Sequence, residues 1–197
     1  MGGSWARLIS VTRRVLDSVL VDSKNHKLTY EVLCTLLAEV MAIVNSRPLV
    51  PVSTDVDDPF ILMPAVLLTQ KTNRAVEPFD HINIKDAYWS QWKHVQCLAE
   101  LFWRRWRREY IQTLQSRQKW NADTRSIQED DIVIMKDKSV ARSMWPMGKV
   151  IRVFPSDDDL VRKVEIRVCV NGRPVSYVRP VTEIVHLLLI VTHNLIV

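Results

Sequence analysis

Hydrophobic residues recur at three- and four-residue steps over much of the first 120 positions, which is the pattern of amphipathic helices. The first such stretch runs from Trp5 to Leu20 and keeps its apolar residues on one stripe. Three basic residues fall off that stripe: Arg7, Arg13 and Arg14. The spacing therefore predicts a helix with one face toward a core and a basic opposite side.

A second helix carries its start and stop signals in the sequence: Thr29 as a cap, Glu31 in the first turn and Pro48 after an end near Asn45. Its apolar residues cover more than half of the circumference, so it should lie well buried. Five prolines between positions 48 and 80 then favour turns and extended segments. Residues 51–84 are predicted to be a proline-rich connector with a short apolar piece, Phe60 to Leu68.

The helical signal is strongest from Asp86 to about Trp120, where tryptophans and other apolar residues repeat at helical spacing without glycine or proline. An unbroken helix of this length extends on the order of 50 Å at 1.5 Å per residue. A bend near Ile111 to Ser116 would divide it. Residues 85–126 are assigned to this long basic, tryptophan-rich helix.

After Ile127 the pattern changes to a period of two with β-branched residues, which is typical of strands. Strands are expected at 132–135, 149–154 and 164–168, and Tyr177 to Val178 offers another. This spacing fits a small β-barrel over residues 127–187, followed by an apolar tail at 188–197. The predicted fold class is therefore α+β, with helices over residues 1–50 and 85–126 and the barrel last.

Composition excludes several classes of function. The three cysteines stand in no ligand spacing, and the four glycines cannot build a phosphate-cradling loop, which excludes a cysteine zinc site and a nucleotide-hydrolysing loop. We predict no catalytic or metal-binding residues, no cofactor and no small-molecule substrate, and we interpret Glu129–Asp131 and Asp157–Asp159 as turn charges. No apolar run reaches the roughly 18 residues that span a bilayer, so no membrane partner is expected and the expected location is the nucleus or cytoplasm.

The formal net charge of +5 is unevenly distributed along the chain. Residues 1–84 carry 8 basic and 9 acidic side chains, residues 85–126 carry 9 and 4, and residues 127–197 carry 10 and 9. Arginine beside tryptophan suits nucleic acid, because a guanidinium group binds phosphate bidentately. The predicted phosphate contacts are Arg104, Arg105, Arg107, Arg108, Arg117 and Lys119 on the long helix, and Lys149, Arg152, Arg162 and Arg179 on the strands.

A plainer interpretation of the same helix is that its tryptophans anchor a core and its arginines form a solvated face. Trp103, Trp106 and Trp120 are expected to pack the helix on the barrel rather than to stack on bases. The pattern leaves both interpretations of the arginines open.

Several motifs stand in a recognisable order. The first are Gly2-Gly3-Ser4-Trp5-Ala6-Arg7-Leu8, Leu36 to Val40 and Asn45-Ser46-Arg47-Pro48-Leu49, followed by Trp92, Phe102-Trp103, Trp106, Lys119-Trp120, Asp131-Ile132-Val133, Trp145 to Val150 and Arg179-Pro180-Val181. This order resembles the end of the integrase catalytic core of Bel/Pao-type retrotransposons and the domain of unknown function that closes their polyproteins. The resemblance extends to about Leu187, and it implies a ribonuclease-H-like core and an SH3-like barrel that helps to hold DNA.

The sequence departs from that family at functional positions. The family's Gly-Gly-x-Trp motif is followed by the catalytic Glu of an Asp-Asp-Glu site, whereas Ala6 stands here, and the two aspartates would lie upstream of Met1. The resemblance therefore implies that this chain does not integrate DNA by itself. Asp130 and Asp159 replace glycines of the family, which would strain turns that need a positive φ.

We therefore expect a non-catalytic, DNA-binding fragment derived from an integrase. Another class of function is a protein-interaction module, in which the barrel and the tryptophan-rich helix bind a partner chain or a second copy. The chain could also join an integrase assembly as an inactive subunit, or it could be a translated relic without activity.

Overall fold

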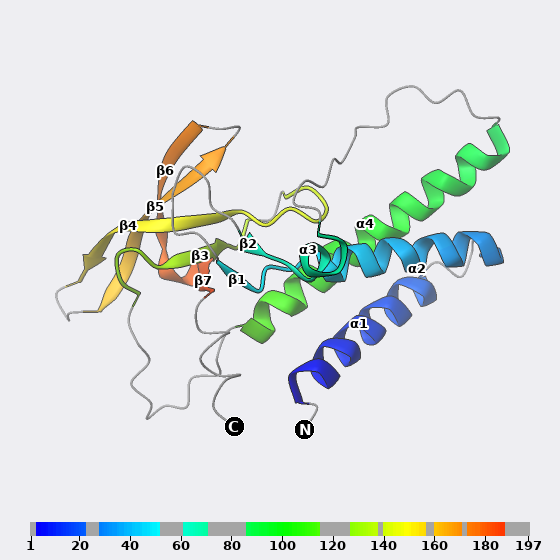
Figure 1. Cartoon of the computed structure of the whole chain (residues 1–197), viewed down its shortest axis with the longest axis horizontal. Coiled ribbons are helices and arrows are strands. Elements are labelled where there is room, and N and C mark those ends of the chain that lie inside the picture. Colours follow the sequence, from blue (N-terminus) through cyan, green and yellow to red (C-terminus); the bar gives the residue numbers. More distant parts are fainter. Residues whose placement is uncertain are drawn as a thin grey trace. The chain divides into compact units, whose positions relative to one another are not determined.

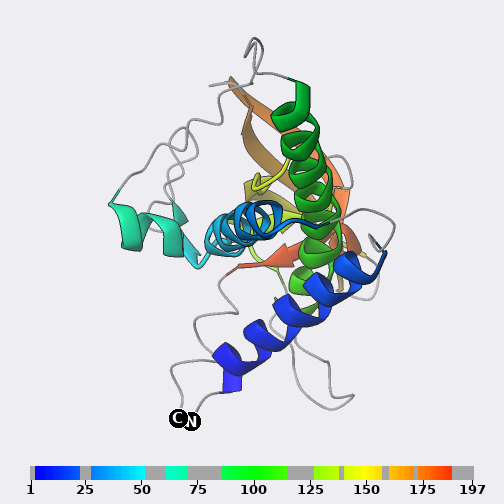
Figure 2. The same ribbon diagram turned by 90° about the vertical axis from the view of Figure 1, so that its right-hand side faces the viewer.

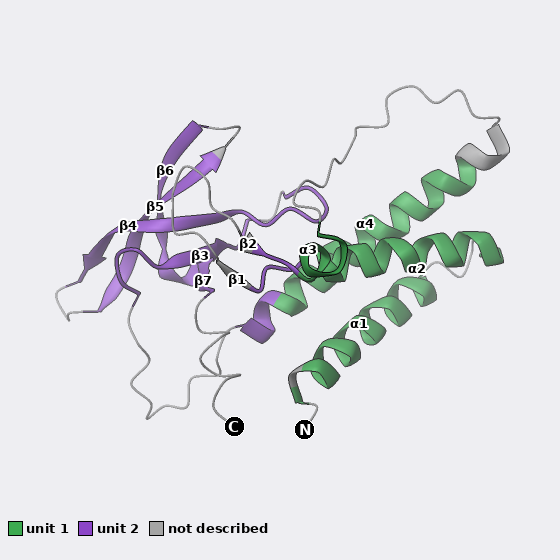
Figure 3. Cartoon of the chain, viewed as in Figure 1, with its two compact units in different colours: residues 1–46, 64–110 green, residues 47–63, 111–197 purple. Residues whose placement is uncertain are grey.

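The computed structural model describes residues 3–22, 28–51, 61–70, 86–114, 127–137, 140–156, 160–170 and 173–187. The chain divides into two compact units (Figures 1 and 3). The helical unit comprises residues 1–46 and 64–110, and the sheet unit comprises residues 47–63 and 111–197. The α+β class is therefore confirmed.

Helix α1 spans Gly3–Asp22, and its inward stripe is the predicted one. Val11, Val15 and Val19 are buried, and the three arginines of this helix are exposed. Trp5 departs from the prediction, because 62% of its surface is exposed. It lies in the first turn of the helix, six residues before buried Val11.

Helix α2 spans Tyr30–Asn45, and its predicted cap is confirmed. The hydroxyl of Thr29 accepts a hydrogen bond from the backbone N–H of Val32 at 3.4 Å. One side is buried, through Val32, Leu36, Val40 and Ile43. The expectation that this helix would lie well buried holds for that side only, since Tyr30, Leu37 and Met41 are exposed on the other side.

The predicted connector contains more regular structure than expected. Helix α3 spans Pro64–Thr69 and contacts α2 within the helical unit (Figure 2). In the sheet unit, strand β1 (Val50–Pro51) pairs with strand β2 (Ile61–Leu62) in an antiparallel ladder. The other residues of the connector, 52–60 and 71–84, lie outside the described residues.

Helix α4 spans Asp86–Leu114 and is the long helix that the sequence predicted. One side of it is buried through a row of large side chains: Val95, Phe102, Trp103, Trp106 and Tyr110. Residues 115–126, which include the predicted continuation and Trp120, lie outside the described residues. In the described part of the chain, no helix is both long enough and apolar enough to cross a membrane.

The sheet unit contains a five-stranded antiparallel sheet in the order β6-β5-β4-β3-β7. Its strands are β3 (Ile132–Met135), β4 (Met147–Pro155), β5 (Val161–Val170), β6 (Arg173–Pro180) and β7 (Ile184–His186), with a 3-10 turn at Val181–Glu183 before β7. Strand β7 was not predicted as a strand, although it lies within the segment assigned to the barrel. The described strands form an open sheet with β6 and β7 at its edges, so a closed barrel is not confirmed.

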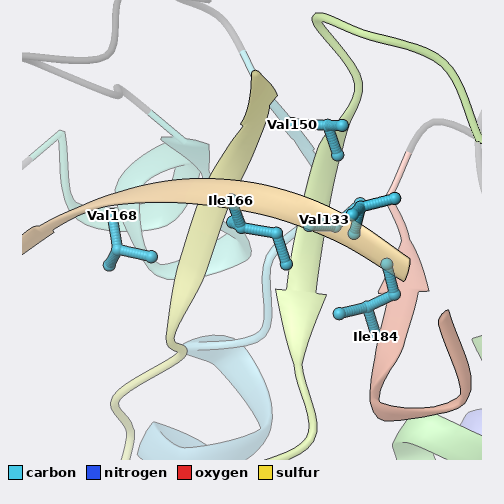
Figure 4. Close-up of a cluster of buried hydrophobic side chains, with 6 residues drawn as sticks. Val133, Val150, Ile166, Val168 and Ile184 are labelled. Carbon is cyan, nitrogen blue, oxygen red and sulfur yellow. The ribbon is translucent and has the colours of Figure 1, made fainter. Parts of the chain in front are cut away.

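One cluster of core residues lies on one face of this sheet, and β3 is also buried on its other face through Ile132 and Ile134. The buried members of this cluster come from β3, β4, β5 and β7: Val164 and, labelled in Figure 4, Val133, Val150, Ile166, Val168 and Ile184. Gly148 lets β4 and β5 approach closely, since a Cβ there would lie 2.3 Å from Ile166 Cγ2. In β5 every second side chain belongs to this cluster, as the period-two pattern predicted: Val164, Ile166 and Val168.

Candidate nucleic-acid interface

The basic run of α4 does not form a single surface. Arg104 is exposed, and its Nε lies 2.9 Å from Glu100 Oε1, one turn earlier on the same helix. Arg105 reaches α1, where it donates to Ser18 Oγ at 2.9 Å and to Asp22 Oδ2 at 2.6 Å. These two guanidinium groups are therefore already engaged within the helical unit.

Of the remaining two arginines of the run, Arg107 is buried and Arg108 is exposed. Arg107 is 8% exposed, and its guanidinium carbon lies 5.9 Å from the centre of the Trp103 ring. Such burial does not favour the phosphate contact that the sequence suggested. Arg108 is exposed and makes no ion pair with the residues that the structure describes. Arg117 and Lys119 lie outside the described residues.

The tryptophans of α4 belong to a buried aromatic row. Trp103 and Trp106 are 1% and 0% exposed, and their ring centres lie 6.4 Å apart. Trp106 also stacks on Tyr110 with a centre distance of 5.0 Å. Bases cannot reach these two rings, so Trp103 and Trp106 do not form a base-stacking surface.

A second ion pair joins α1 to α4. Arg14 of α1 bonds Glu109 of α4, one turn beyond the contact of Arg105 with Ser18 and Asp22. The partners run in opposite order along the two helices, so α1 and α4 are antiparallel. Charges on this side of the helical unit are therefore largely used to hold helices together.

The strands place cations on the outward face of the sheet. Directly opposite residues on antiparallel strands share a face, and the β4–β5 register pairs Lys149 with Arg167, Arg152 with Glu165 and Phe154 with Lys163. The intervening pairs are Val150 with Ile166 and Val153 with Val164, whose members face the core. The outward face of β4 and β5, which we call the basic face, thus carries four cations, Lys149, Arg152, Lys163 and Arg167, and one carboxylate, Glu165, directly opposite Arg152.

The cations of the basic face are mostly unneutralised. Arg152, Lys163 and Arg167 are exposed and make no ion pair within the described part of the chain. Lys149 lies 2.7 Å from Asp130 Oδ1, and 20% of its side chain is exposed. Because Lys149 and Arg167 stand directly opposite each other, they repel, and an anion bound between them would relieve that repulsion.

Two of the predicted strand residues lie elsewhere. Arg179 is opposite Val164, on the core side of the β6 edge, with Glu183 at 3.6 Å and the Tyr177 ring at 5.8 Å. Arg162 is exposed where the β4–β5 register shifts. The sequence analysis missed Lys163 and Arg167, although their alternation with the apolar residues of β5 was the signal that could have found them.

The turn before β3 differs from its prediction as a purely surface charge. Glu129 and Asp130 are exposed, and Asp130 has a φ of 71°, so the positive φ expected at this turn is confirmed. Asp131 is buried, accepts a hydrogen bond from the Gln128 N–H at 2.9 Å and lies 3.2 Å from His186 Nε2. This carboxylate therefore fixes the start of β3 to β7.

The sheet unit contains another partly desolvated cation. Lys136 Nζ donates to the carbonyl oxygen of Thr182 at 2.6 Å, and burial lowers the pKa of Lys136 below its usual value. Across the described residues, no group of three or more His, Cys, Asp or Glu side chains is placed to hold a metal ion.

The comparisons with known proteins cover the second half of the chain. The model of a family of unknown function (DUF5641) matches residues 90–187, which include most of α4 and all strands from β3 to β7. No curated protein and no solved structure matches the chain. Residues 90–187 are therefore similar to a family whose function is itself unassigned.

Proposed function

We propose that this chain binds DNA through its basic face without cutting or joining it. The observation that carries the proposal is the β4–β5 register, which gathers Arg152, Lys163 and Arg167 on one exposed face. The one carboxylate that the register adds to this face, Glu165, makes no ion pair with them among the described residues. Phosphate groups of a nucleic acid are the partner that such a surface fits, because arginine and lysine neutralise them and release counterions. Exposed Arg108 of α4 supplies a further, smaller contribution.

The proposal includes an origin in an integrase. Ala6 stands where the related catalytic cores have their third metal-binding carboxylate, so the chain contributes binding rather than catalysis. The strand order supports the expected SH3-like barrel, because β7 returns to pair with β3 after the meander of β3, β4, β5 and β6. In this proposal, the sheet unit corresponds to the small module that holds DNA.

Measuring duplex affinity at two salt concentrations tests the proposal. We expect the wild-type chain to bind a short duplex tightly at about 50 mM salt and far more weakly at about 200 mM salt. In the triple variant Arg152→Gln, Lys163→Gln and Arg167→Gln, the slope of log affinity against log salt should fall by about three, one for each phosphate contact. These side chains are exposed, so the variant should unfold at the wild-type temperature.

Arg105→Gln is the matched control, since this arginine is engaged by Ser18 and Asp22. It should leave duplex affinity close to the wild-type value. Absence of binding by the wild-type chain at low salt, or a triple variant with unchanged affinity, would sink the proposal.

An exposed apolar strip supports a second candidate function, a protein-interaction or self-association module. Tyr30, Leu37 and Met41 of α2 are 78%, 39% and 61% exposed, and Leu67 and Leu68 of the neighbouring α3 are 60% and 72% exposed. Large exposed apolar patches mark interaction surfaces. Self-association that does not change with salt, in a chain without affinity for DNA, would favour this candidate.

A further inference from the structure

The basic face carries one exposed aromatic ring. Phe154, near the end of β4, is 36% exposed. It stands directly opposite Lys163 on β5 and two residues after Arg152 on its own strand. The ring therefore lies on the same face as the cations rather than in the core.

Strand geometry sets the spacing between this ring and its neighbours. Opposite residues of an antiparallel pair have Cβ atoms about 5 Å apart. Residues two apart along a strand are separated by about 7 Å. Lys163 and Arg152 thus flank Phe154 at short range, and neither cation makes an ion pair within the described residues.

We propose that the basic face binds an unpaired DNA strand, with a base stacked on Phe154 and the backbone held by Arg152, Lys163 and Arg167. This inference rests on the proposed function and specifies its ligand. An aromatic ring between cations on a sheet is the arrangement with which proteins hold single strands, because any base presents a flat face for stacking. Bases within a duplex are covered on both faces by their neighbours, so a protruding ring has no face to contact there.

Tyr177 offers an internal comparison. It has the same exposed fraction as Phe154, 36%, but it is opposite Ile166 and therefore stands on the core side of the β6 edge. Its ring lies 5.8 Å from the Arg179 guanidinium carbon, which occupies one side of it. Phe154 is therefore the candidate for base stacking because it lies on the basic face, not because it is more exposed than Tyr177.

The test compares a single-stranded oligonucleotide with the duplex of the same sequence, measured by fluorescence anisotropy at low salt. Phe154→Leu keeps an apolar side chain but removes the ring, so it should weaken binding of the single strand by about fivefold or more. Duplex affinity should stay at the wild-type value. Phe154→Trp should keep single-strand affinity, and Tyr177→Leu, the matched control, should alter neither affinity.

The outcomes separate this inference from the function on which it rests. Unchanged single-strand affinity in Phe154→Leu, with duplex binding by the wild-type chain intact, overturns the inference and leaves the proposed function standing. An equal loss for both forms of DNA also overturns it, because the ring would then contribute without regard to base pairing. If the wild-type chain binds neither form, both proposals fail.

Discussion

The helical unit and the sheet unit use their cations differently. In the helical unit, Arg14, Arg104 and Arg105 each contact a carboxylate of the same unit. In the sheet unit, Lys149 and Arg179 also face carboxylates, but Arg152, Lys163 and Arg167 are exposed and make no ion pair among the described residues. The densest basic run in the sequence, Arg104–Arg108, thus makes mostly contacts within its own unit.

The two periodicities explain this difference. A run of five residues on a helix advances by more than a full turn, so Arg104–Arg108 cannot share one face. Arg107 consequently points into the buried side, and Arg105 points toward α1. On a strand, every second residue shares a face, and an antiparallel neighbour doubles the set. A moderately basic pair of strands can therefore present more available charge than a highly basic helix.

Removing Trp106 should give the largest effect and should act on the helical unit. Trp106 is fully buried and stacks on Phe102 and Tyr110 with centre distances of 6.4 and 5.0 Å. Trp106→Ala should lower the free energy of unfolding by about 3–5 kcal/mol, through lost burial and the cavity left behind. Chemical denaturation gives this value, and hydrogen exchange should show the largest loss of protection in α1, α2 and α4.

The matched control for that variant is Trp5→Ala, because Trp5 is 62% exposed on α1. It should change the free energy of unfolding by less than about 0.5 kcal/mol. If the two variants were equally destabilised, the buried aromatic row would not be what stabilises the helical unit.

A methyl group added at Gly148 should act on the sheet unit. The added Cβ would lie 2.3 Å from Ile166 Cγ2 and 2.7 Å from the Arg167 carbonyl oxygen, closer than packed atoms allow. Gly148→Ala should therefore cost about 1–3 kcal/mol of stability, since β4 and β5 must separate to admit it. Loss of duplex affinity in the same variant would show that the basic face depends on this close approach.

Gly3→Ala provides the comparison in the helical unit. A Cβ at Gly3 has no atom within 4 Å, and Gly3 begins α1. Alanine there should be neutral or slightly stabilising, because it restricts the unfolded chain. Destabilisation at Gly3 equal to that at Gly148 would contradict the packing argument.

The sequence predicted the helices and strands better than it predicted which side chains share an exposed surface. Thr29 and the apolar stripes of α1 and α4 define helices through local spacing, so those helices were found close to their observed bounds. Strand β7 was missed because its three residues are stabilised by pairing with β3, which is a contact remote in sequence. The short pair β1–β2 and helix α3 were missed in the proline-rich connector for a similar reason.

The candidate site shows the same limit. Lys163 and Arg167 alternate with buried valine and isoleucine, so their shared face was readable from β5 by itself. Their proximity to Arg152 and Phe154 depends on the register between β4 and β5, which a bulge near Val150 shifts by one residue. The pattern of residues along a single strand does not predict how that strand is aligned with its neighbour. The burial of Arg107 likewise depends on which side of α4 is covered.

Glu31 should give the smallest effect and should make the helical unit sensitive to acid. Its pKa is lowered below 4.5, first by a hydrogen bond from the backbone N–H of its own residue and then by one from the Thr29 side chain at the start of α2. A carboxyl group whose pKa is lower in the folded state stabilises that state above its unfolded pKa, and the contribution disappears as pH falls through the folded pKa. Urea unfolding should thus show Glu31→Gln to be slightly less stable than wild type at neutral pH and equally stable well below pH 4.5. The pKa of Lys136 in the sheet unit is also lowered, but the effect on stability is opposite: burial disfavours the charged ammonium, and this cost is relieved only as pH rises toward 10.5. A difference between wild type and Glu31→Gln that persists at acid pH would show that α2 gains from the side chain's packing rather than from its charge.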